Sequence, residues 1–455
     1  IPTKRSVSGS ALITFIFAVG RSYSMSASFA IPFSRLFFLP ALLAESHRNF
    51  LPMTSNSSSA SRSFRLSLVH DFLIQMGGAE KVVEVMAEAY PEAPIYTSAT
   101  LGENLFPIFR SPRVQNSWMN RLPGMERLHK KLFFLYPLAF KSLHIEDSDV
   151  AWISSSSFSK WIPKPAGTKF VCYCHTPPRY FWNPDEYLEN EIRNPFLRGF
   201  VRLLMPLFRL SDLRQSRKVD LFLANSRNVQ ERIRECYGRE SIVVYPPVDV
   251  NRFQVSDRSD DFYLIVSRLV AYKHIDRAVK AFTISGKKLV IIGDGPDRGR
   301  LESIAGSSVT FLGRAPDAMV TEKMATCRAY IFPGSEDFGI TPVEAQACGK
   351  PVIAFRDGGA LETVMEGTTG LFFDNPDAES LLAAIAKFET MNWSASEIRR
   401  NAERFSVARF LEETRDCLDR VALEAVADSP TRREETLSRQ ASNPLLSQRL
   451  PESGS

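Results

Sequence analysis

The sequence lacks several features that would point to particular classes of protein. Its 6 cysteines are scattered, with no Cys-x-x-Cys pair and no metal-type grouping, which favours reduced cytosolic thiols over a disulfide framework. No uninterrupted apolar run reaches the roughly 18–20 residues of a membrane-spanning helix. The net charge is only +5 over 455 residues. The positions of the basic residues therefore say more than their sum.

The two ends of the chain differ from the rest. Apolar runs at 11–19 and 29–44 are too short or too interrupted to span a bilayer. We interpret residues 1–62 as a leader that is disordered or precedes the true start of translation, with Met53 as a natural start; the alternative is a signal or anchor. The polar residues 425–455, rich in Pro and Ser, are expected to form a disordered tail.

Between these ends, short buried runs alternate with amphipathic stretches. This pattern predicts an α/β protein with parallel sheets covered by helices on both faces. A break near 248–260 divides it into two Rossmann-like domains that face each other across a cleft, at 63–247 and 248–405, and a helix at 406–424 is expected to return to the first domain. The runs taken as strands are 64–70, 150–158, 169–175, 220–226, 241–247, 262–269, 288–295, 309–314, 329–333 and 351–355.

A strand, a loop and a helix start follow one another within 332–355. Glu336 and Gly339 lie in the loop, and Thr341 followed by proline is typical of a helix N-terminus. Thr341 and Glu344 also form the Thr-x-x-Glu pattern of a capping box. Glu344 could therefore serve only to cap its own helix.

The alternative is that this loop and helix start bind a ligand. The backbone N–H groups of Gly339, Ile340 and Thr341 could hold a phosphate or sugar hydroxyls. Glu336 and Glu344 could accept hydrogen bonds from hydroxyls on either side. We prefer this interpretation because it also explains why Glu336 and Gly339 are present in the loop.

Two basic residues follow the predicted strand at 262–269. Arg268 and Lys273 are five positions apart, and such a pair on a loop is usually only solvated. Here the pair leaves the end of a strand in the same domain as the helix start. Two cations there could neutralise a departing diphosphate.

These motifs resemble those of the retaining glycosyltransferases of family 4, which have the two-domain GT-B fold. The resemblance covers roughly residues 64–424. Within it, HDFLIQMGGAEKV (70–82) and CHTPPRYFW (174–182) look most like the mannosyltransferase branch, which uses GDP-mannose to build bacterial surface polysaccharides. The segments that carry the resemblance are MGGAEKV (76–82), CHTPPRYFW (174–182), SRLVAYK (267–273), GDGP (293–296) and EDFGITPVE (336–344), the last being the E-x7-E signature.

The resemblance implies a set of site residues. Arg268 and Lys273 match the diphosphate pair, Glu336 the residue beside the transferred sugar, and Glu344 the one that binds the ribose. The implied catalytic residues are His175, Glu336, Arg268 and Lys273. The implied donor-binding residues are Gly77, Gly78, Arg268, Lys273, Gly313, Arg314, Phe338, Gly339, Ile340, Thr341 and Glu344.

Some of these residues would have an ordinary structural role without the resemblance. Gly77 and Gly78 would form a strand-to-helix turn, whereas in the family they let the backbone approach the donor phosphates. His175 would be structural, whereas in the family it contacts the donor sugar. Gly313 and Arg314 lie where the family holds the base.

No metal or cofactor is predicted. The Asp-Ser-Asp triplet at 147–149 resembles a glycosyltransferase metal motif but lies in a turn before a strand. GDGP lacks the full G-x-G-x-x-G and is weak evidence for a dinucleotide. The nucleotide diphosphate sugar is a substrate, and a GDP-sugar is favoured over a UDP-sugar.

The combined prediction is a metal-independent hexosyltransferase that moves a sugar, preferably mannose, to a glycan or lipid-linked acceptor. No nucleic acid is expected as a partner. Basic, apolar stretches at 121–141 and 193–218 predict a cytoplasmic protein in peripheral contact with an anionic membrane, unless they are buried helices with a basic rim. The alternative functions are a sugar-nucleotide epimerase on the same fold and a non-catalytic nucleotide-sugar binding protein.

Overall fold

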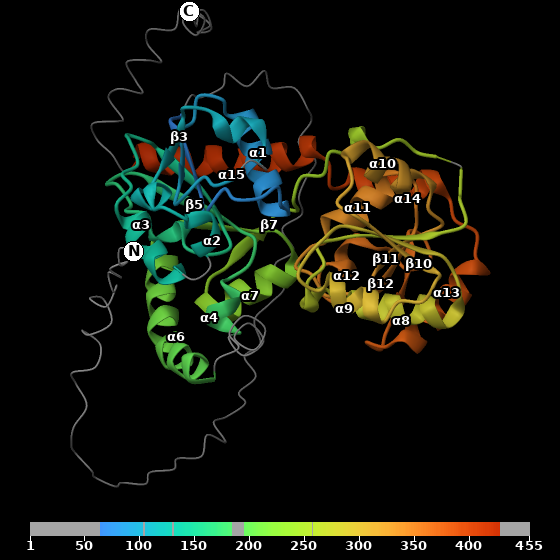
Figure 1. Ribbon diagram of the computed structural model, residues 1–455. Helices are drawn as coiled ribbons and strands as arrows, with labels where there is room; N and C mark the ends of the chain where they lie inside the picture. Colours follow the sequence, from blue (N-terminus) through green and yellow to red (C-terminus); the bar gives the residue numbers. More distant parts are fainter. Residues whose placement is uncertain (1–63, 103–104, 130–131, 184–194, 257, 428–455) are drawn as a thin grey trace, which may run out of the picture. The chain divides into compact units, whose positions relative to one another are not determined.

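The computed structural model describes residues 64–102, 105–129, 132–183, 195–256 and 258–427. The predicted leader at 1–62 lies outside the described residues, as does the predicted tail beyond residue 427. The described chain contains two parallel sheets of 7 and 6 strands (Figure 1). The predicted pair of Rossmann-like α/β domains is confirmed.

The sheet of the N-terminal domain has the strand order β3-β2-β1-β4-β5-β6-β7. Two of its strands, β2 and β3, were not predicted, because runs of three residues show no periodicity. The strands are β1 (Leu66–His70), β2 (Ile95–Thr97), β3 (Val114–Asn116), β4 (Val150–Ser155), β5 (Lys169–Cys174), β6 (Leu221–Ala224) and β7 (Ser241–Val243).

Helices cover both faces of this sheet. Alternate side chains of β4 and β5 point to opposite faces, so that Ile153 joins one buried cluster and Trp152 the other. The helical segments of this domain are α1 (Gly78–Ala89), η1 (Pro107–Arg110), η2 (Trp118–Arg121), α2 (Met125–Leu128), η3 (Phe133–Leu135), α3 (Tyr136–Lys141), η4 (Ser159–Trp161), α4 (Arg179–Trp182), α6 (Pro195–Ser216) and α7 (Arg227–Tyr237).

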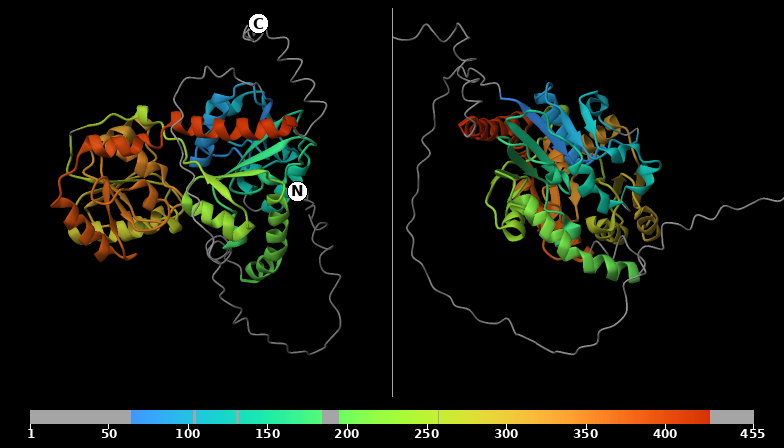
Figure 2. Two further views of the ribbon diagram at one scale, coloured as in Figure 1. Left: turned by 180° about the vertical axis from the view of Figure 1, so that it is seen from behind. Right: turned by 90° about the vertical axis from the view of Figure 1, so that its left-hand side faces the viewer.

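The last described helix, α15 (Val407–Ala427), packs on the first sheet although it follows the second domain in sequence. It runs across the N-terminal domain beside α1 (Figures 1 and 2). Phe410 of α15 stacks on Trp152 at 6.0 Å. The helix continues three residues beyond the predicted end at 424, because Ala425 is still fully buried against the domain.

The sheet of the C-terminal domain has the order β10-β9-β8-β11-β12-β13. Its strands are β8 (Tyr263–Val266), β9 (Leu289–Ile292), β10 (Val309–Gly313), β11 (Tyr330–Phe332), β12 (Val352–Phe355) and β13 (Gly370–Phe373), the last of which was not predicted. Its helical segments are η5 (Val250–Arg252), η6 (Ala271–Lys273), α8 (Ile275–Ser285), α9 (Arg298–Ser303), α10 (Asp317–Thr326), α11 (Ile340–Ala347), α12 (Ala360–Thr363), α13 (Ala378–Glu389) and α14 (Ala395–Glu403).

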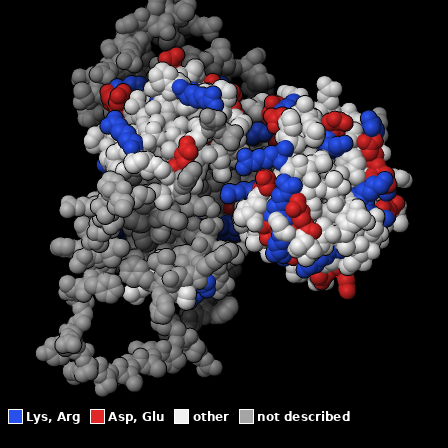
Figure 3. Space-filling view, viewed as in Figure 1, with Lys and Arg blue, Asp and Glu red and all other residues white. Residues whose placement is uncertain are grey.

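The charged surface of this domain is mixed. On the face shown in Figure 3, basic and acidic side chains lie side by side over the C-terminal domain. None of the described helices is long and apolar enough to cross a bilayer.

Candidate active site

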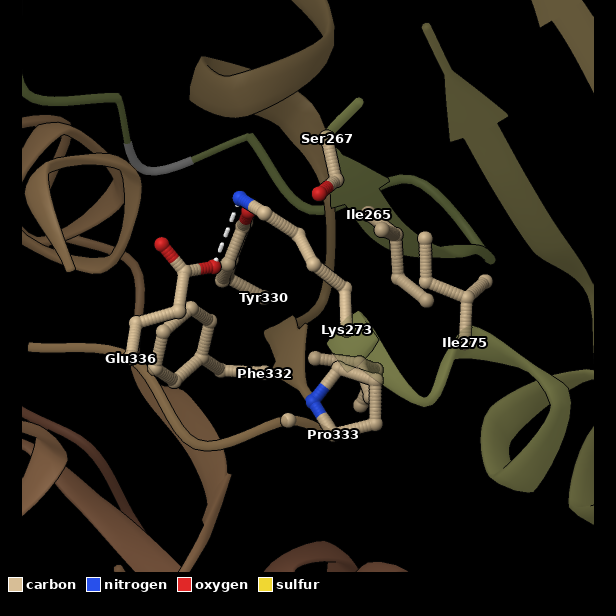
Figure 4. A pocket seen from close by; sticks show the side chains of 10 residues that line it. Ile265, Ser267, Lys273, Ile275, Tyr330, Phe332, Pro333 and Glu336 are labelled. Atoms are coloured by element: carbon tan, nitrogen blue, oxygen red, sulfur yellow. Dashed lines mark ion pairs between the residues drawn. The ribbon is translucent and has the colours of Figure 1, made fainter. Parts of the chain in front are cut away.

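The loop after β8 carries both predicted basic residues. Lys273 ends η6, and its Nζ lies 2.8 Å from Oε1 of Glu336 (Figure 4). Both side chains of this ion pair are partly exposed. Arg268 is exposed, and in the described part of the chain its guanidinium forms no ion pair or hydrogen bond with another side chain. The structure thus brings Lys273 and Glu336 together and leaves Arg268 open to a ligand.

Gly293, the first glycine of GDGP, allows the loop after β8 to pass close to the backbone that follows β9. A Cβ on Gly293 would lie 1.9 Å from the carbonyl oxygen of Ser267, far inside the distance that real atoms adopt. Only glycine fits this close approach. We interpreted GDGP as weak evidence for a dinucleotide, and missed that it supports the loop carrying Arg268.

The helix start after Glu336 differs from the predicted one. Helix α11 begins at Ile340, with Gly339 as its N-cap at φ 86°. Thr341 lies inside the first turn, with its Oγ1 3.0 Å from the hydroxyl of Tyr330. The predicted Thr341–Glu344 capping box is wrong, because the left-handed conformation of Gly339 starts the helix earlier.

The start of α11 leaves backbone donors available. No described residue accepts a hydrogen bond from the N–H groups of Gly339, Ile340 or Thr341. A helix N-terminus with such groups attracts anions. Tyr330 fixes this end of the helix to the end of β8, since its hydroxyl also donates to the carbonyl of Val266 at 2.9 Å.

Glu344 faces the N-terminal domain. Its Oε1 lies 2.8 Å from Nζ of Lys81 on α1, a partner that the sequence did not suggest. A Cβ on Gly78 would lie 3.2 Å from Cδ1 of Ile340. The predicted glycine loop of the N-terminal domain and the start of α11 therefore lie close together.

The glycine loop at the start of α1 is held by a buried carboxyl group. Glu80 is 2% exposed, and its carboxylate accepts hydrogen bonds from the backbone N–H groups of Glu80 and Gly77 and from Gln75. Burial nevertheless outweighs these bonds and raises the pKa of Glu80 to about 7.

Three predicted donor-binding residues do not present their side chains at the Lys273–Glu336 ion pair or at the start of α11. The Phe338 side chain is 3% exposed and packs on Tyr245 and Phe405, so only its backbone remains in the loop. Gly313 ends β10, and its carbonyl accepts a hydrogen bond from Gly293 N–H at 2.8 Å. Arg314 is exposed beyond it.

His175 directly follows β5 in the N-terminal domain. Its Nε2 lies 2.8 Å from Oγ of Ser154, and its carbonyl accepts a hydrogen bond from Asn225 at 3.0 Å. Burial, with a smaller contribution from nearby His70, lowers the pKa of His175 to about 3. The ring is therefore neutral at physiological pH.

A carboxylate beside Glu336 connects the loops of the two domains. Asp337 accepts from Arg232 of α7 and lies 2.9 Å from Arg179, which starts α4. Arg232 also donates to the hydroxyl of Thr176, the residue after His175. No local sequence pattern indicated this link, because its members are far apart in the chain.

No metal site is present in the described part of the chain: no three His, Cys, Asp or Glu side chains lie together there as metal ligands would. Asp147 and Asp149 of the Asp-Ser-Asp triplet both bind Arg65.

Two family models match the chain. The model Glycosyltransferase Family 4 matches residues 76–252, and Glycosyl transferases group 1 matches residues 249–405. Together they cover well over half of the chain. The chain belongs to the family 4 glycosyltransferases. The predicted family membership is thereby confirmed.

The family 4 relatives with curated names include two mannosyltransferases. The chain is 27% identical over 214 residues to GDP-mannose-dependent alpha-(1-6)-phosphatidylinositol monomannoside mannosyltransferase of Mycolicibacterium smegmatis, covering 40% of this chain and 56% of that protein. It is 22% identical over 427 residues to alpha-1,3/1,6-mannosyltransferase of Candida glabrata, covering 77% and 90%. The chain spans little more than half the length of the mycobacterial relative.

A solved structure shares the fold. The crystal structure of HepE from Anabaena in complex with UDP and glucose matches with a TM-score of 0.58 at 19% identity, covering 78% of this chain and 100% of that one. The predicted GT-B fold is confirmed.

Proposed function

We propose that this family 4 enzyme transfers mannose from GDP-mannose, with retention of configuration, to a glycan or lipid-linked acceptor. The observation that carries the proposal is the ion pair of Lys273 with Glu336, together with the N–H groups at the start of α11 that bond no described acceptor. Arg268 lies on the same loop as Lys273 and is exposed. Fixed positive charge of this kind stabilises a leaving diphosphate. The names of the mycobacterial and yeast relatives support mannose, and the former supports GDP.

In the proposed reaction, the bond between the anomeric carbon and the diphosphate oxygen breaks, and its electron pair stays on the diphosphate. Arg268, Lys273 and the start of α11 neutralise that charge. The acceptor hydroxyl attacks from the face that the diphosphate leaves, and its proton passes to a diphosphate oxygen. Glu344 would hold the ribose, and Glu336 would lie beside the sugar and orient Lys273.

The test is transfer by the full chain with GDP-mannose and a mannose-terminated lipid-linked acceptor. Release of GDP is expected only with acceptor present, with an axial product linkage by NMR and a thermal shift larger for GDP- than for UDP-sugars. An epimerase would convert the sugar nucleotide without acceptor, and a binding protein would do neither.

We further propose that this transfer needs no metal, since Arg268 and Lys273 supply positive charge. Activity is expected to persist in EDTA. Loss of transfer that Mn²⁺ restores would contradict this part of the proposal.

We propose that α6 brings the enzyme to the cytoplasmic face of an anionic membrane. Leu203, Leu207 and Leu210 form an apolar ridge at helical spacing, and Leu203 is 73% exposed. Exposed Phe134 of η3 and Leu138 of α3 belong to a segment that contacts α6. Such an apolar face among basic residues binds anionic bilayers.

One arginine of this stretch has a structural role. The Nε of Arg209 donates to the carbonyl of Phe181, so its replacement would disturb packing. Replacing exposed leucines therefore tests the membrane contact more cleanly than replacing the arginines. The variant is Leu203→Gln combined with Leu207→Gln. It should reduce sedimentation with anionic liposomes, whereas Leu361→Gln, at an exposed leucine of α12, should not. Equal binding to neutral vesicles would contradict the proposal.

A further inference from the structure

His175 is connected to a second histidine through one serine hydroxyl. The Oγ of Ser154 lies 2.8 Å from Nε2 of His175 and 3.1 Å from Nδ1 of His70. His70 ends β1 and is the register partner of Ser154 on β4, while His175 follows β5. The first two side chains are aligned by the register of β1 and β4, and His175 reaches the same hydroxyl from the residue that follows β5, the next strand of the sheet.

The end of β4 is itself anchored. The carboxylate of Asp71, which follows His70, accepts hydrogen bonds from the backbone N–H groups of Ser156 at 2.6 Å and Ser159 at 2.7 Å. The backbone that carries Ser154 therefore has little freedom to move its hydroxyl away from the two rings.

Both rings are neutral, which limits how the protons are arranged. Burial is the main cause that lowers the pKa of His70 and of His175. A neutral imidazole has one N–H and one bare nitrogen, and a hydroxyl has one proton to donate. Ser154 Oγ could also accept from both rings, but its own proton would then need another acceptor, and the hydroxyl bonds no described group besides these two nitrogens. Ser154 therefore donates to one histidine and accepts from the other.

The far nitrogen of His70 distinguishes the two arrangements. His70 is 1% exposed, and its Nε2 has no hydrogen-bond partner. If Ser154 donated to His70, the proton of that ring would be on Nε2, leaving a buried N–H without an acceptor. Among backbone groups, such orphaned N–H groups are rarer than unsatisfied acceptors. The favoured arrangement is His70 Nδ1–H donating to Ser154, and Ser154 donating to His175 Nε2.

We propose that His70 and Ser154 are positioning residues that hold His175 in the tautomer with its proton on Nδ1. Among the described residues, the His175 ring bonds only Ser154, through Nε2. This inference rests on the proposed function. In that reaction, the Nδ1–H of His175 donates a hydrogen bond to an oxygen of the transferred sugar. A sugar nucleotide that lacks an acceptor oxygen at that position is then bound less well.

The direct test is the tautomer of His175 in the full chain labelled with ¹⁵N-histidine. The chain has 6 histidines, and the signal missing from His175→Gln identifies the residue. Two-bond proton–nitrogen correlation at neutral pH should show a protonated Nδ1 and a bare Nε2. In Ser154→Ala, the proton should shift wholly or partly to Nε2. A wild-type proton on Nε2, or an unchanged tautomer in Ser154→Ala, would overturn the proposal.

Ser67→Ala is the matched control. It removes an equally buried hydroxyl of β1, whose partner among the described residues is Ser148. The tautomer of His175 should stay unchanged in this variant. A shift as large as that in Ser154→Ala would show that any lost buried hydroxyl has the effect, and would overturn the proposal.

Kinetics give a second readout. Ser154→Ala should lower kcat/KM for the sugar donor roughly three- to tenfold, the range for one hydrogen bond, with KM for the acceptor unchanged. His70→Asn, whose amide can still donate to Ser154, should retain more activity than His70→Leu. Equal losses in both would overturn the proposal. A wild-type enzyme without transfer activity would contradict the proposed function alone, because the tautomer is measured without substrate.

Discussion

The two domains hold their candidate site residues by different means. In the C-terminal domain, the loops carrying Arg268 and Glu336 lie against Gly293 and Gly359, where any Cβ would overlap backbone atoms. In the N-terminal domain, His175 is held through the side chain of Ser154. Close backbone contact fixes the path of a loop and so the position of a charge. A side-chain hydrogen bond fixes the position of a proton.

The largest effect is expected from removing the charges of the C-terminal domain. Arg268→Ala, Lys273→Ala and Glu336→Ala should each lower kcat by about 10²-fold or more, the effect of losing one preorganised electrostatic contact. Stability should barely change, because these side chains are exposed or partly exposed. Because Lys273 and Glu336 form an ion pair, their double variant should lose less than the two single losses combined.

Thermal unfolding and single-turnover rates measure both parts of this prediction. Arg300→Ala is the control, since Arg300 of α9 is an exposed arginine of the same domain that pairs with Asp297. It should leave kcat unchanged. If the three site variants unfold instead, the residues are structural and the candidate site is wrong.

The second prediction tests the backbone contact itself. A Cβ on Gly359 would lie 2.3 Å from Cα of Phe338, and the Gly359 N–H donates to the carbonyl of Glu336 at 2.8 Å. Gly359→Ala should therefore displace the Glu336 loop and lower the free energy of unfolding by about 3 kcal/mol or more. Urea denaturation and activity should both report the change.

The control for this variant is another glycine of the same domain. Gly299 lies in α9, with nothing within 4 Å of where its Cβ would be. Gly299→Ala should be neutral or stabilise by roughly 0.5–1 kcal/mol, the helix preference of alanine. Equal destabilisation by the two variants would mean that the Gly359 contact has no special role.

The difference between the domains also explains what could be predicted from the sequence. The loops that carry Arg268 and Glu336 lie at the ends of the apolar runs at 262–269 and 329–333, so local patterns located them. The predicted start of α11 was wrong because Thr341 and the following proline form a strong local signal for a helix N-terminus. Gly339, with its left-handed backbone, is the N-cap instead, two residues before Thr341. The strand β13 was missed because it is short and opens with a glycine.

The support of His175 could not be predicted in the same way. His70 and Ser154 are 84 residues apart, and no local pattern links one to the other. Their contact exists only because β1 and β4 are neighbours in a particular register. A sequence pattern can indicate a strand, but not which side chains of two distant strands share a face and a hydroxyl proton.

The smallest predicted effect concerns the glycine loop of the N-terminal domain, which is held by a side chain and not by backbone. A Cβ on Gly77 would lie 2.5 Å from Oε2 of Glu80. Since burial raises the pKa of Glu80 to about 7 from 4.5, the folded state binds more protons between these values, and stability falls as pH rises through them. Glu80→Gln cannot ionise, so its stability relative to wild type should improve from pH 5 to pH 8 by on the order of 2 kcal/mol.

Glu240→Gln, at an exposed carboxylate of the same domain, should show no such trend in urea denaturation. If Glu80→Gln and wild type respond equally to pH, Glu80 is ionised in the fold, and the loop is held by a charge.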